Sequence, residues 1–138
     1  MRRIVFVDTS AWYALVDSDD ACHSKAADRM KQLTSNRDVA FTTNYVVSEA
    51  YTLMRVRLGA SVAHEFLRRT RDSNLTQRYF FPESWEGSAE DLLFQYRDQD
   101  FSYVDATSFV TMRRLGIHEA LAFDHHFAVL GFVLYAER

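Results

Sequence analysis

Cysteine, proline and glycine are all scarce in this chain, and each scarcity excludes a class of protein. The 138 residues include one cysteine, one proline and four glycines. A lone cysteine, Cys22, cannot form a disulfide framework or a cysteine-based zinc site within one chain, and it favours a reducing cytoplasm as the compartment. With 48% hydrophobic residues, the chain is neither disordered nor of low complexity. We therefore expect one domain, spanning residues 1–138, that buries a full core.

A long apolar run is missing as well. The apolar run that follows Met1, Arg2 and Arg3 is interrupted by Asp8 and is too short for a signal peptide. No later stretch approaches the length of a membrane span, so we expect no membrane partner. The net charge of −3 argues against a protein that coats nucleic acid. Nucleic acid stays open as a substrate, because a metal ion can supply positive charge locally.

Arginine is the main cation, and it occurs in three groups. These groups are Arg55 and Arg57, then Arg68, Arg69 and Arg71, and finally Arg113 and Arg114. Charge runs of this kind are usually solvated helix faces, which is the interpretation we favour for most of them. The alternative is contact with phosphate, which the planar guanidinium makes in bidentate geometry.

Strand-like and helix-like segments alternate along the chain, without repeats or a linker. Apolar runs predict strands at residues 4–7, 39–42, 75–81, 120–123 and 132–135, the last of them at an edge. Helical spacing predicts helices at residues 10–16, 23–33, 44–58, 60–71, 84–97 and 102–115. Ser10 or Thr9 can cap the first helix and Asn44 the third, and Gly59 and Gly116 stand where helices end. The alternation predicts an α/β fold with a central, mostly parallel sheet of four or five strands and helices on both faces.

Acids follow two of the predicted strands and lie early in two of the predicted helices. Asp8 follows the first strand and Asp124 the fourth. The carboxyl ends of parallel strands meet at the edge where open α/β sheets bind their ligands. Glu49 lies early in the helix after the second strand, and Asp105 opens the last predicted helix, each beside an apolar stripe. We therefore expect all four carboxylates at one edge of the sheet.

Each acid alone also has a purely structural interpretation. The run from Ser102 to Asp105 matches a capping box, and Asp8 and Asp124 are suited to turns or caps after strands. For Glu49, a surface ion pair with a neighbouring arginine is the simpler reading. The expected convergence favours function, because carboxylates about 5 Å apart repel by roughly 3 kcal/mol per pair at an effective dielectric near 20.

A cluster of four acids would hold protons or bind a hard cation. Ligands that are all oxygen favour Mg²⁺ or Mn²⁺ over zinc. Such a site suits the hydrolysis of a phosphodiester, in which the metal activates water and neutralises charge on the leaving oxygen. Ser10 and Thr9 could position that water or a phosphate oxygen, and helix capping remains open for both.

Four stretches form an ordered set along nearly the whole chain: Val7-Asp8-Thr9-Ser10-Ala11-Trp12, Ser48-Glu49-Ala50, Phe101-Ser102-Tyr103-Val104-Asp105-Ala106-Thr107-Ser108-Phe109 and Ala122-Phe123-Asp124-His125-His126-Phe127. Together they resemble the PIN-domain nucleases, and specifically the VapC-like toxins of toxin–antitoxin pairs. The resemblance implies a three-layer PIN fold and Mg²⁺- or Mn²⁺-dependent endoribonuclease activity. It also implies inhibition by a small antitoxin protein, often with toxin dimerisation.

By the same resemblance, Asp8, Glu49, Asp105 and Asp124 correspond to the catalytic, metal-binding acids of the family. Family members often carry a histidine at the position of His126, which implies a supporting role there. From the residues alone, local capping and solvent contact are the favoured interpretation for both His125 and His126.

Trp12 and Tyr13 are expected to be partly in the core; if exposed, they would suit a groove for an antitoxin helix. Two other families fail on single residues. A haloacid-dehalogenase-type phosphotransferase needs a second acid where Ser10 stands, and a response-regulator receiver needs a late lysine, whereas no lysine follows Lys31. Two alternatives stay open: a PIN-like nuclease that matures RNA without an antitoxin, and a non-catalytic PIN-like binding module.

Overall fold

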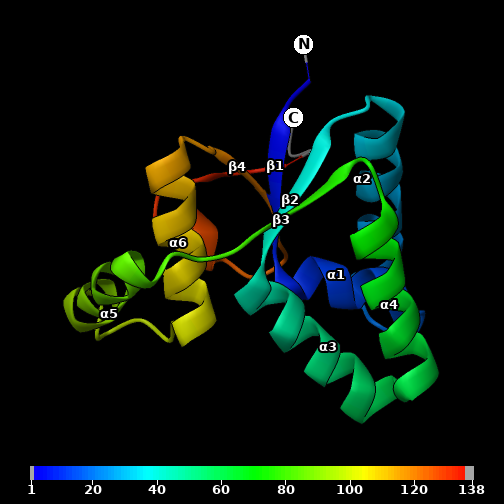
Figure 1. Cartoon of the computed structure of the whole chain (residues 1–138), viewed down its shortest axis with the longest axis horizontal. Helices are drawn as coiled ribbons and strands as arrows, with labels where there is room; N and C mark the ends of the chain where they lie inside the picture. Colours follow the sequence, from blue (N-terminus) through cyan, green and yellow to red (C-terminus); the bar gives the residue numbers. More distant parts are fainter. Residues whose placement is uncertain (1, 136–138) are drawn as a thin grey trace.

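A five-stranded parallel sheet forms the centre of the molecule. The computed structural model describes residues 2–135. Its strands are β1 (Ile4–Val7), β2 (Val39–Thr43), β3 (Thr76–Tyr79), β4 (Glu119–Leu121) and β5 (Val133–Leu134). They lie in the order β3-β2-β1-β4-β5, and every neighbouring pair is parallel (Figure 1). The predicted α/β fold class is confirmed, and β5 is an edge strand as expected.

The central position of β1 explains its unbroken apolar sequence. Val5, Phe6 and Val7 are completely buried, because helices cover the strand on both faces and strands flank it on both sides. A strand buried in this way has no polar face, which is why its residues do not alternate. β1 therefore fixes the position of Asp8, the residue that follows it.

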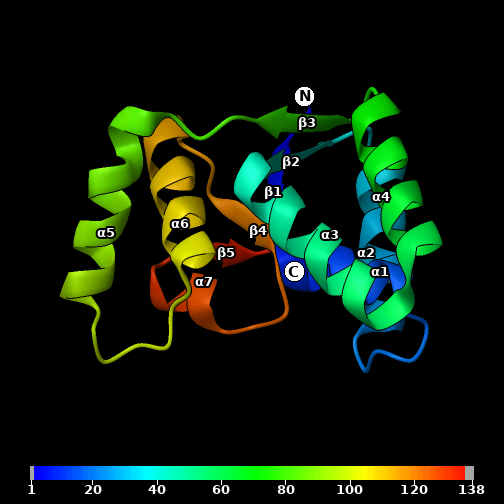
Figure 2. The ribbon, with the colours of Figure 1, turned by 60° about the horizontal axis from the view of Figure 1, so that its bottom comes forward.

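Helices cover both faces of the sheet. They are α1 (Thr9–Val16), α2 (His23–Ser35), α3 (Asn44–Leu58), α4 (Ala60–Asp72), the 3₁₀ turn η1 (Glu83–Trp85), α5 (Glu86–Gln95), α6 (Tyr103–Leu115) and α7 (His126–Val129). Figures 1 and 2 show α2 and α4 on one side of the sheet, and α5 and α6 on the other. Among the described residues, no helix combines the length and the apolar character needed to cross a membrane.

Most predicted elements are present, with differences at their ends. The helix predicted at residues 44–58 has those bounds, but its N-cap is Thr43, whose side chain accepts from the Val46 N–H. The side chain of Asn44 instead accepts from the backbone N–H of Phe81, at 2.8 Å. Asp8, and neither Ser10 nor Thr9, is the N-cap of α1. The short helix α7 was not predicted from the sequence.

Two glycines end helices in different ways. Gly116 has φ 68 and ψ 32, the left-handed conformation expected of a residue just past a helix. Gly59, between α3 and α4, has φ 98 and ψ 169, so its backbone is extended with a positive φ. Both conformations strain a residue with a side chain, which accounts for glycine at these positions.

Trp12 and Tyr13 are core residues, as expected in part. The side chain of Trp12 is 5% exposed, its indole N–H donates to the Thr42 hydroxyl at 3.3 Å, and its ring lies edge-on to Phe66. Tyr13 is 7% exposed. Both rings are therefore mainly core residues, and only a small part of Trp12 reaches the surface.

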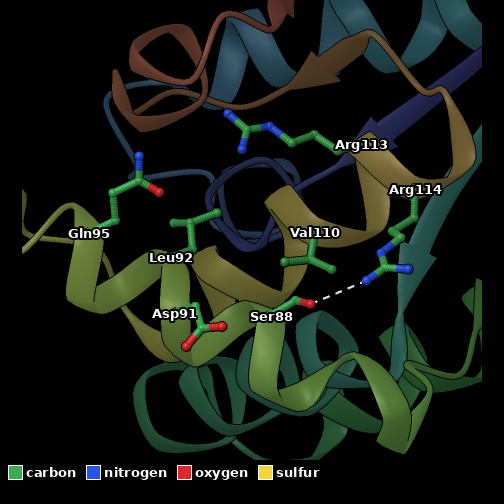
Figure 3. A pocket seen from close by; sticks show the side chains of 7 residues that line it. All are labelled: Ser88, Asp91, Leu92, Gln95, Val110, Arg113 and Arg114. Atoms are coloured by element: carbon green, nitrogen blue, oxygen red, sulfur yellow. Dashed lines mark hydrogen bonds between the residues drawn. The ribbon is translucent and has the colours of Figure 1, made fainter.

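The arginine groups differ in their surroundings. Arg68 and Arg69 form ion pairs with Glu65 on the exposed face of α4, which confirms the solvated-face interpretation for them. Arg114 lies over the ring of Trp85 and donates to Ser88 at 3.2 Å. It borders a hollow of about 340 Å³ between α5 and α6, at the end of α6 opposite Asp105 (Figure 3).

Candidate metal centre

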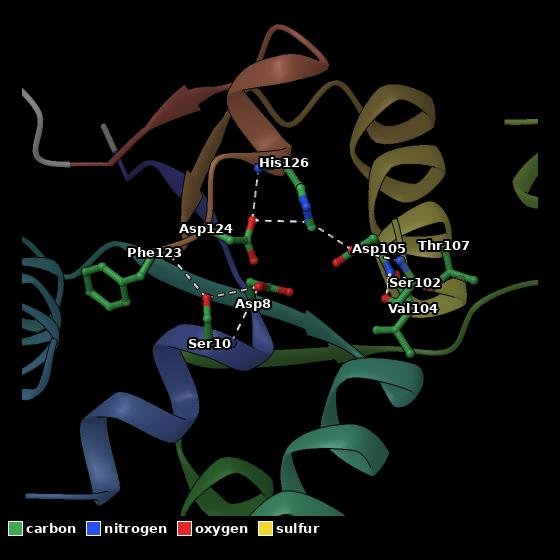
Figure 4. A network of polar contacts seen from close by, with 9 residues as sticks. All are labelled: Asp8, Ser10, Ser102, Val104, Asp105, Thr107, Phe123, Asp124 and His126. Carbon is green, nitrogen blue, oxygen red and sulfur yellow. Dashed lines mark hydrogen bonds and ion pairs between the residues drawn. The ribbon is translucent and has the colours of Figure 1, made fainter. Parts of the chain in front are cut away.

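Acidic side chains from three separate parts of the chain converge at the carboxyl edge of the sheet. Asp8 directly follows β1, Asp124 lies in the loop after β4, and Asp105 is in the first turn of α6. Figure 4 shows these three side chains facing one hollow, with His126 above them. Their sequence separation explains why only the assembled sheet can bring them together.

Asp105, Asp124 and His126 lie closest to one another. One ligand atom of each lies within 4.8 Å of the others. The ring Nδ1 of His126 is 3.1 Å from Asp105 Oδ2 and 3.7 Å from Asp124 Oδ1. The side chain of Asp124 is 33% exposed, whereas those of Asp105 and His126 are 13% and 16% exposed. The group is therefore open to solvent mainly through Asp124.

Asp8 is the most deeply buried acid of the site, at 3% exposure. Burial first, and then the negative charges of Asp124 and Asp105, raise its pKa from 3.8 to about 7. The Thr9 backbone N–H and the Ser10 hydroxyl oppose the rise by stabilising the charged form. Burial and the two neighbouring carboxylates both disfavour the charged form of Asp8 in the metal-free site.

The structural interpretations of these acids are also correct. Asp105 and Ser102 form a complete capping box: the Ser102 hydroxyl accepts from the Asp105 N–H, and Asp105 Oδ2 accepts from the Ser102 N–H, both at 2.9 Å. Burial raises the pKa of Asp105, while this bond to the Ser102 N–H lowers it. Asp124 Oδ1 accepts from the His126 N–H at 3.0 Å. Capping and convergence therefore coexist in the same side chains.

Ser10 links two parts of the site. Its hydroxyl donates to Asp8 Oδ2 at 3.0 Å and accepts from the Phe123 N–H at 3.1 Å. These two hydrogen bonds connect the loop that carries Asp124 to the side chain of Asp8 (Figure 4). Thr9 is buried, and its hydroxyl has no hydrogen-bond partner among the described residues.

Glu49 is not brought into this group by any described contact. It is half-buried in the second turn of α3, a helix that begins at the same edge of the sheet. Within residues 2–135, the acid-and-histidine group contains Asp105, Asp124 and His126 but neither Asp8 nor Glu49, and Asp8 is linked to it by the effect of Asp124 and Asp105 on its pKa. Its place among the metal-binding acids stays a prediction.

His126 takes a larger part in the site than the residues alone suggested. Its backbone N–H joins the local turn, as expected, but its ring faces Asp105 instead of solvent. The ring of Phe101 lies edge-on to it at 5.1 Å and fixes its orientation. His125 is exposed, as expected. The missing signal was α7, which begins at His126 and turns its side chain inward.

The donor set fits a divalent cation. Carboxylate oxygens from three acids suit Mg²⁺ or Mn²⁺. Besides burial, the negative charges of Asp124 and Asp105 contribute to the raised pKa of Asp8, so the three acids bring negative charge to one place. A cation placed there would relieve that charge and favour the ionised form of every acid.

Comparisons with known proteins agree with this geometry. A family model described as PIN domain matches residues 5–133. The chain is 38% identical, over 133 residues, to the 23S rRNA-specific endonuclease VapC20 of two Mycobacterium tuberculosis strains, which covers 94% of this chain and 96% of that protein.

Two solved structures are similar as well. The crystal structure of Mycobacterium tuberculosis VapC20, described as a Sarcin-Ricin loop cleaving toxin, matches with a TM-score of 0.83 and 36% identity over 94% of this chain and 96% of that one. FitAcB from Neisseria gonorrhoeae matches with a TM-score of 0.67 over 95% and 96% of the two chains. At 11% identity, the second match shows a shared fold only.

Proposed function

This chain belongs to the PIN-domain family, and on that premise we propose that it is a metal-dependent endoribonuclease, the toxin of a type II toxin–antitoxin pair. The observation that carries the proposal is the convergence of Asp8, Asp105 and Asp124 in one hollow at the carboxyl edge of the sheet. We propose that residues 1–138 form a single PIN domain that works in the cytoplasm.

The proposed chemistry is hydrolysis of an RNA phosphodiester. A bound Mg²⁺ or Mn²⁺ would activate water and neutralise the charge on the leaving oxygen. Asp8, Asp105 and Asp124 would hold the ion, and Glu49 would join them directly or through water. His126 would orient Asp105 through its ring nitrogen, and Ser10 would keep Asp8 and the Asp124 loop in register.

Ribosomal RNA is the substrate class we propose. The relative that is 38% identical over most of both chains is named for cleavage of 23S rRNA. Purified protein should cleave intact ribosomal RNA at one position in Mg²⁺ or Mn²⁺, which sequencing of the new 5′ ends would locate. Cleavage at many unrelated positions would overturn the substrate and leave the nuclease activity standing.

Catalysis itself is tested by removing single charges. Asp8→Asn and Asp105→Asn should each lower the cleavage rate by at least about a thousandfold, because each removes a proposed metal ligand. Asp28→Asn is the matched control, since Asp28 is exposed on α2 away from the hollow. Wild-type protein that binds RNA but never cleaves it in either metal would favour a binding module instead.

An antitoxin needs an apolar surface on the toxin, and a groove between α1, α2 and α4 offers one. It has a volume of about 570 Å³, and Trp12, Leu15, Met30, Val62 and Phe66 are among its lining residues. We propose that it takes the apolar face of an antitoxin helix.

Val62→Glu should abolish the complex with the small protein encoded next to the toxin, measured by titration calorimetry. Val56→Glu is the control, because Val56 is 78% exposed on α3 and does not line the groove. Equal affinity of both variants for the antitoxin would rule out the groove. The absence of any neighbouring antitoxin gene would favour an RNA-maturation nuclease. A homodimer is proposed as well, and analytical ultracentrifugation tests it.

A further inference from the structure

A second hollow opens directly beside the acids and shares two side chains with them. It has a volume of about 320 Å³, and Ser10 and Asp124 form its wall toward the candidate metal centre. Tyr13, Arg57 and Phe123 line it farther out. We call this hollow the Arg57 pocket. It is continuous with the place where a scissile phosphate would lie under the proposed function.

Arg57 gives the pocket its positive charge. Among the described residues that line the pocket, it is the one arginine or lysine. Its guanidinium lies over the ring of Tyr13, 5.3 Å from the centroid, so the aromatic face holds the planar group in place. When the face of a guanidinium packs against a ring, the N–H groups at its edge can still donate to an anion. A phosphate can accept two of these N–H groups at once, in bidentate geometry.

The acids around Arg57 are already engaged by other donors. Asp17 Oδ2 accepts from the Tyr13 hydroxyl at 2.6 Å, and Asp17 Oδ1 accepts from the Asp19 N–H. Asp20 Oδ1 accepts from the Cys22 N–H at 2.8 Å. No ion pair joins Arg57 to an acid among the described residues. Arg57 still stabilises the charged forms of Tyr13 and Asp17, and the Tyr13 hydroxyl and, more weakly, Arg57 lower the pKa of Asp17. No ion-pair contact, however, occupies the guanidinium edge of Arg57 among the described residues.

Arg57 lies near the end of α3 that is farther from the edge of the sheet where the acids meet. Glu49, Leu53 and Arg57 lie four residues apart on one face of α3, so Arg57 is about 12 Å along the helix axis from Glu49. One or two nucleotides span such a distance. Phe123 lines the same pocket next to Asp124, and Arg29 lies over its ring. An aromatic side chain beside a cation is the combination that holds single-stranded RNA.

We propose that the Arg57 pocket binds the RNA strand next to the scissile bond, with a flanking phosphate on the Arg57 guanidinium and the adjoining base near Phe123. This inference rests on the proposed endoribonuclease function. It adds a binding site for the RNA nucleotides on one side of the scissile bond.

The first test compares two charge-removing variants of the same helix. Arg57→Met removes the charge but keeps a long apolar chain over Tyr13, and Arg55→Met makes the same change at an exposed position outside the pocket. Binding of a labelled single-stranded RNA is measured by fluorescence anisotropy in Ca²⁺ across a salt series. Melting temperatures confirm that both variants are folded.

Arg57→Met should weaken RNA binding roughly ten- to hundredfold and reduce the salt slope by about one. Arg55→Met should change both much less. Equal effects of the two variants would overturn the proposal, as would unchanged RNA binding in Arg57→Met. If Arg57→Met weakened binding of the antitoxin but not of RNA, the pocket would belong to a protein partner, and the proposal would be overturned as well.

The second test locates the phosphate. RNA substrates carry one uncharged methylphosphonate at a time on either side of the scissile bond. In the wild type, one flanking position should lower kcat/KM, mainly through KM, and that loss should disappear in Arg57→Met. The same position profile in both proteins would refute the contact. A wild type that cleaves no RNA refutes the endoribonuclease instead, while the anisotropy test of the pocket still gives its answer.

Discussion

Replacing the Asp8 carboxylate by a neutral amide should stabilise the metal-free protein at neutral and alkaline pH. Asp8 is buried, its pKa is raised to about 7 by burial and by the charges of Asp124 and Asp105, and its carboxylate accepts hydrogen bonds from Ser10. Asn keeps a carbonyl oxygen for those bonds and removes the charge. The fold should therefore gain stability from a change that destroys the proposed activity.

The magnitude follows from the difference in proton affinity between the folded and unfolded chains. An Asp8 that titrates near 7 in the folded state and near its model value of 3.8 in the unfolded state corresponds to roughly 4 kcal/mol. The folded chain holds the proton more tightly, so below pH 3.8 the penalty is absent. Stability then falls as the pH rises from about 4 to about 7, and above 7 the whole penalty remains.

The assay is urea unfolding in EDTA at pH values from 4 to 8, followed by circular dichroism. At pH 8, Asp8→Asn should be more stable than the wild type by roughly 2 to 4 kcal/mol, the range allowing for an imperfectly bonded amide. Near pH 4 the two proteins should differ little. Mg²⁺ at about 100 times its dissociation constant should stabilise the wild type by about 2.7 kcal/mol, and the variant much less.

Two results would refute this reasoning. One is a metal-free Asp8→Asn that is no more stable than the wild type at pH 8. The other is a stabilisation of the same size at pH 4 and pH 8, which would show that the gain does not come from the charge. Asp28→Asn, on the exposed face of α2, controls for the loss of one negative charge anywhere on the protein.

Three further predictions concern the neighbours of Asp8. Ser102→Ala should lower the free energy of unfolding by about 1 kcal/mol, because it removes the cap of α6. Asp105→Asn should lower it less, since the amide oxygen still accepts the Ser102 N–H. The opposite order in urea unfolding in EDTA would contradict the capping geometry. Ser10→Ala removes the hydroxyl bonds to Asp8 and to the Phe123 N–H, so it should lower the free energy of unfolding by about 1–3 kcal/mol. It should also lower kcat more than it raises KM. Unaltered kinetics would show that this bridge is structural only. His126→Gln should weaken Mn²⁺ binding roughly tenfold by calorimetry, and unchanged affinity would exclude the ring from the site.

Local sequence patterns predict the main elements of this fold well. The apolar run of β1 and the periodicity of α3 give the observed bounds of those elements, because each keeps one sequence pattern along its length. α7 escapes prediction, since one turn of helix is too short to show a periodic stripe. The predicted strand at 75–81 ends at Tyr79 instead, and Phe80 is exposed beyond it, which residue type alone does not indicate.

Cap positions are less predictable than helices, for a physical reason. Asp8, Thr9 and Ser10 are three consecutive residues that can each cap a helix, so composition cannot choose among them. The choice depends on where the backbone leaves the extended conformation, and it does so after Asp8, whose φ is −83 and ψ 165. The acid that the sequence assigned to chemistry is therefore also the cap.

The candidate site was predictable in its location but not in its details. Parallel strand order alone puts Asp8 and Asp124 at one edge, and the helix start puts Asp105 there too. The ring of His126 points inward only because α7 turns it toward Asp105, and Phe101 packs against it. These are tertiary contacts across 21 and 25 residues of chain, and no local pattern encodes them.

The capping roles of these acids make a metal site more plausible, because a carboxylate has two oxygens and a cap uses one. The described hydrogen bonds and ion pairs of Asp8 and Asp105 go to Oδ2, and those of Asp124 go to Oδ1. The opposite oxygens of Asp105 and Asp124 make no hydrogen bond to the described residues, and they stay available to an ion. A fixed backbone group thus holds each carboxylate in place before any cation arrives, which lowers the entropy that binding must overcome. Ser102→Ala should therefore weaken Mn²⁺ binding although Ser102 itself offers no ligand, and an unchanged affinity would separate the caps from the metal centre.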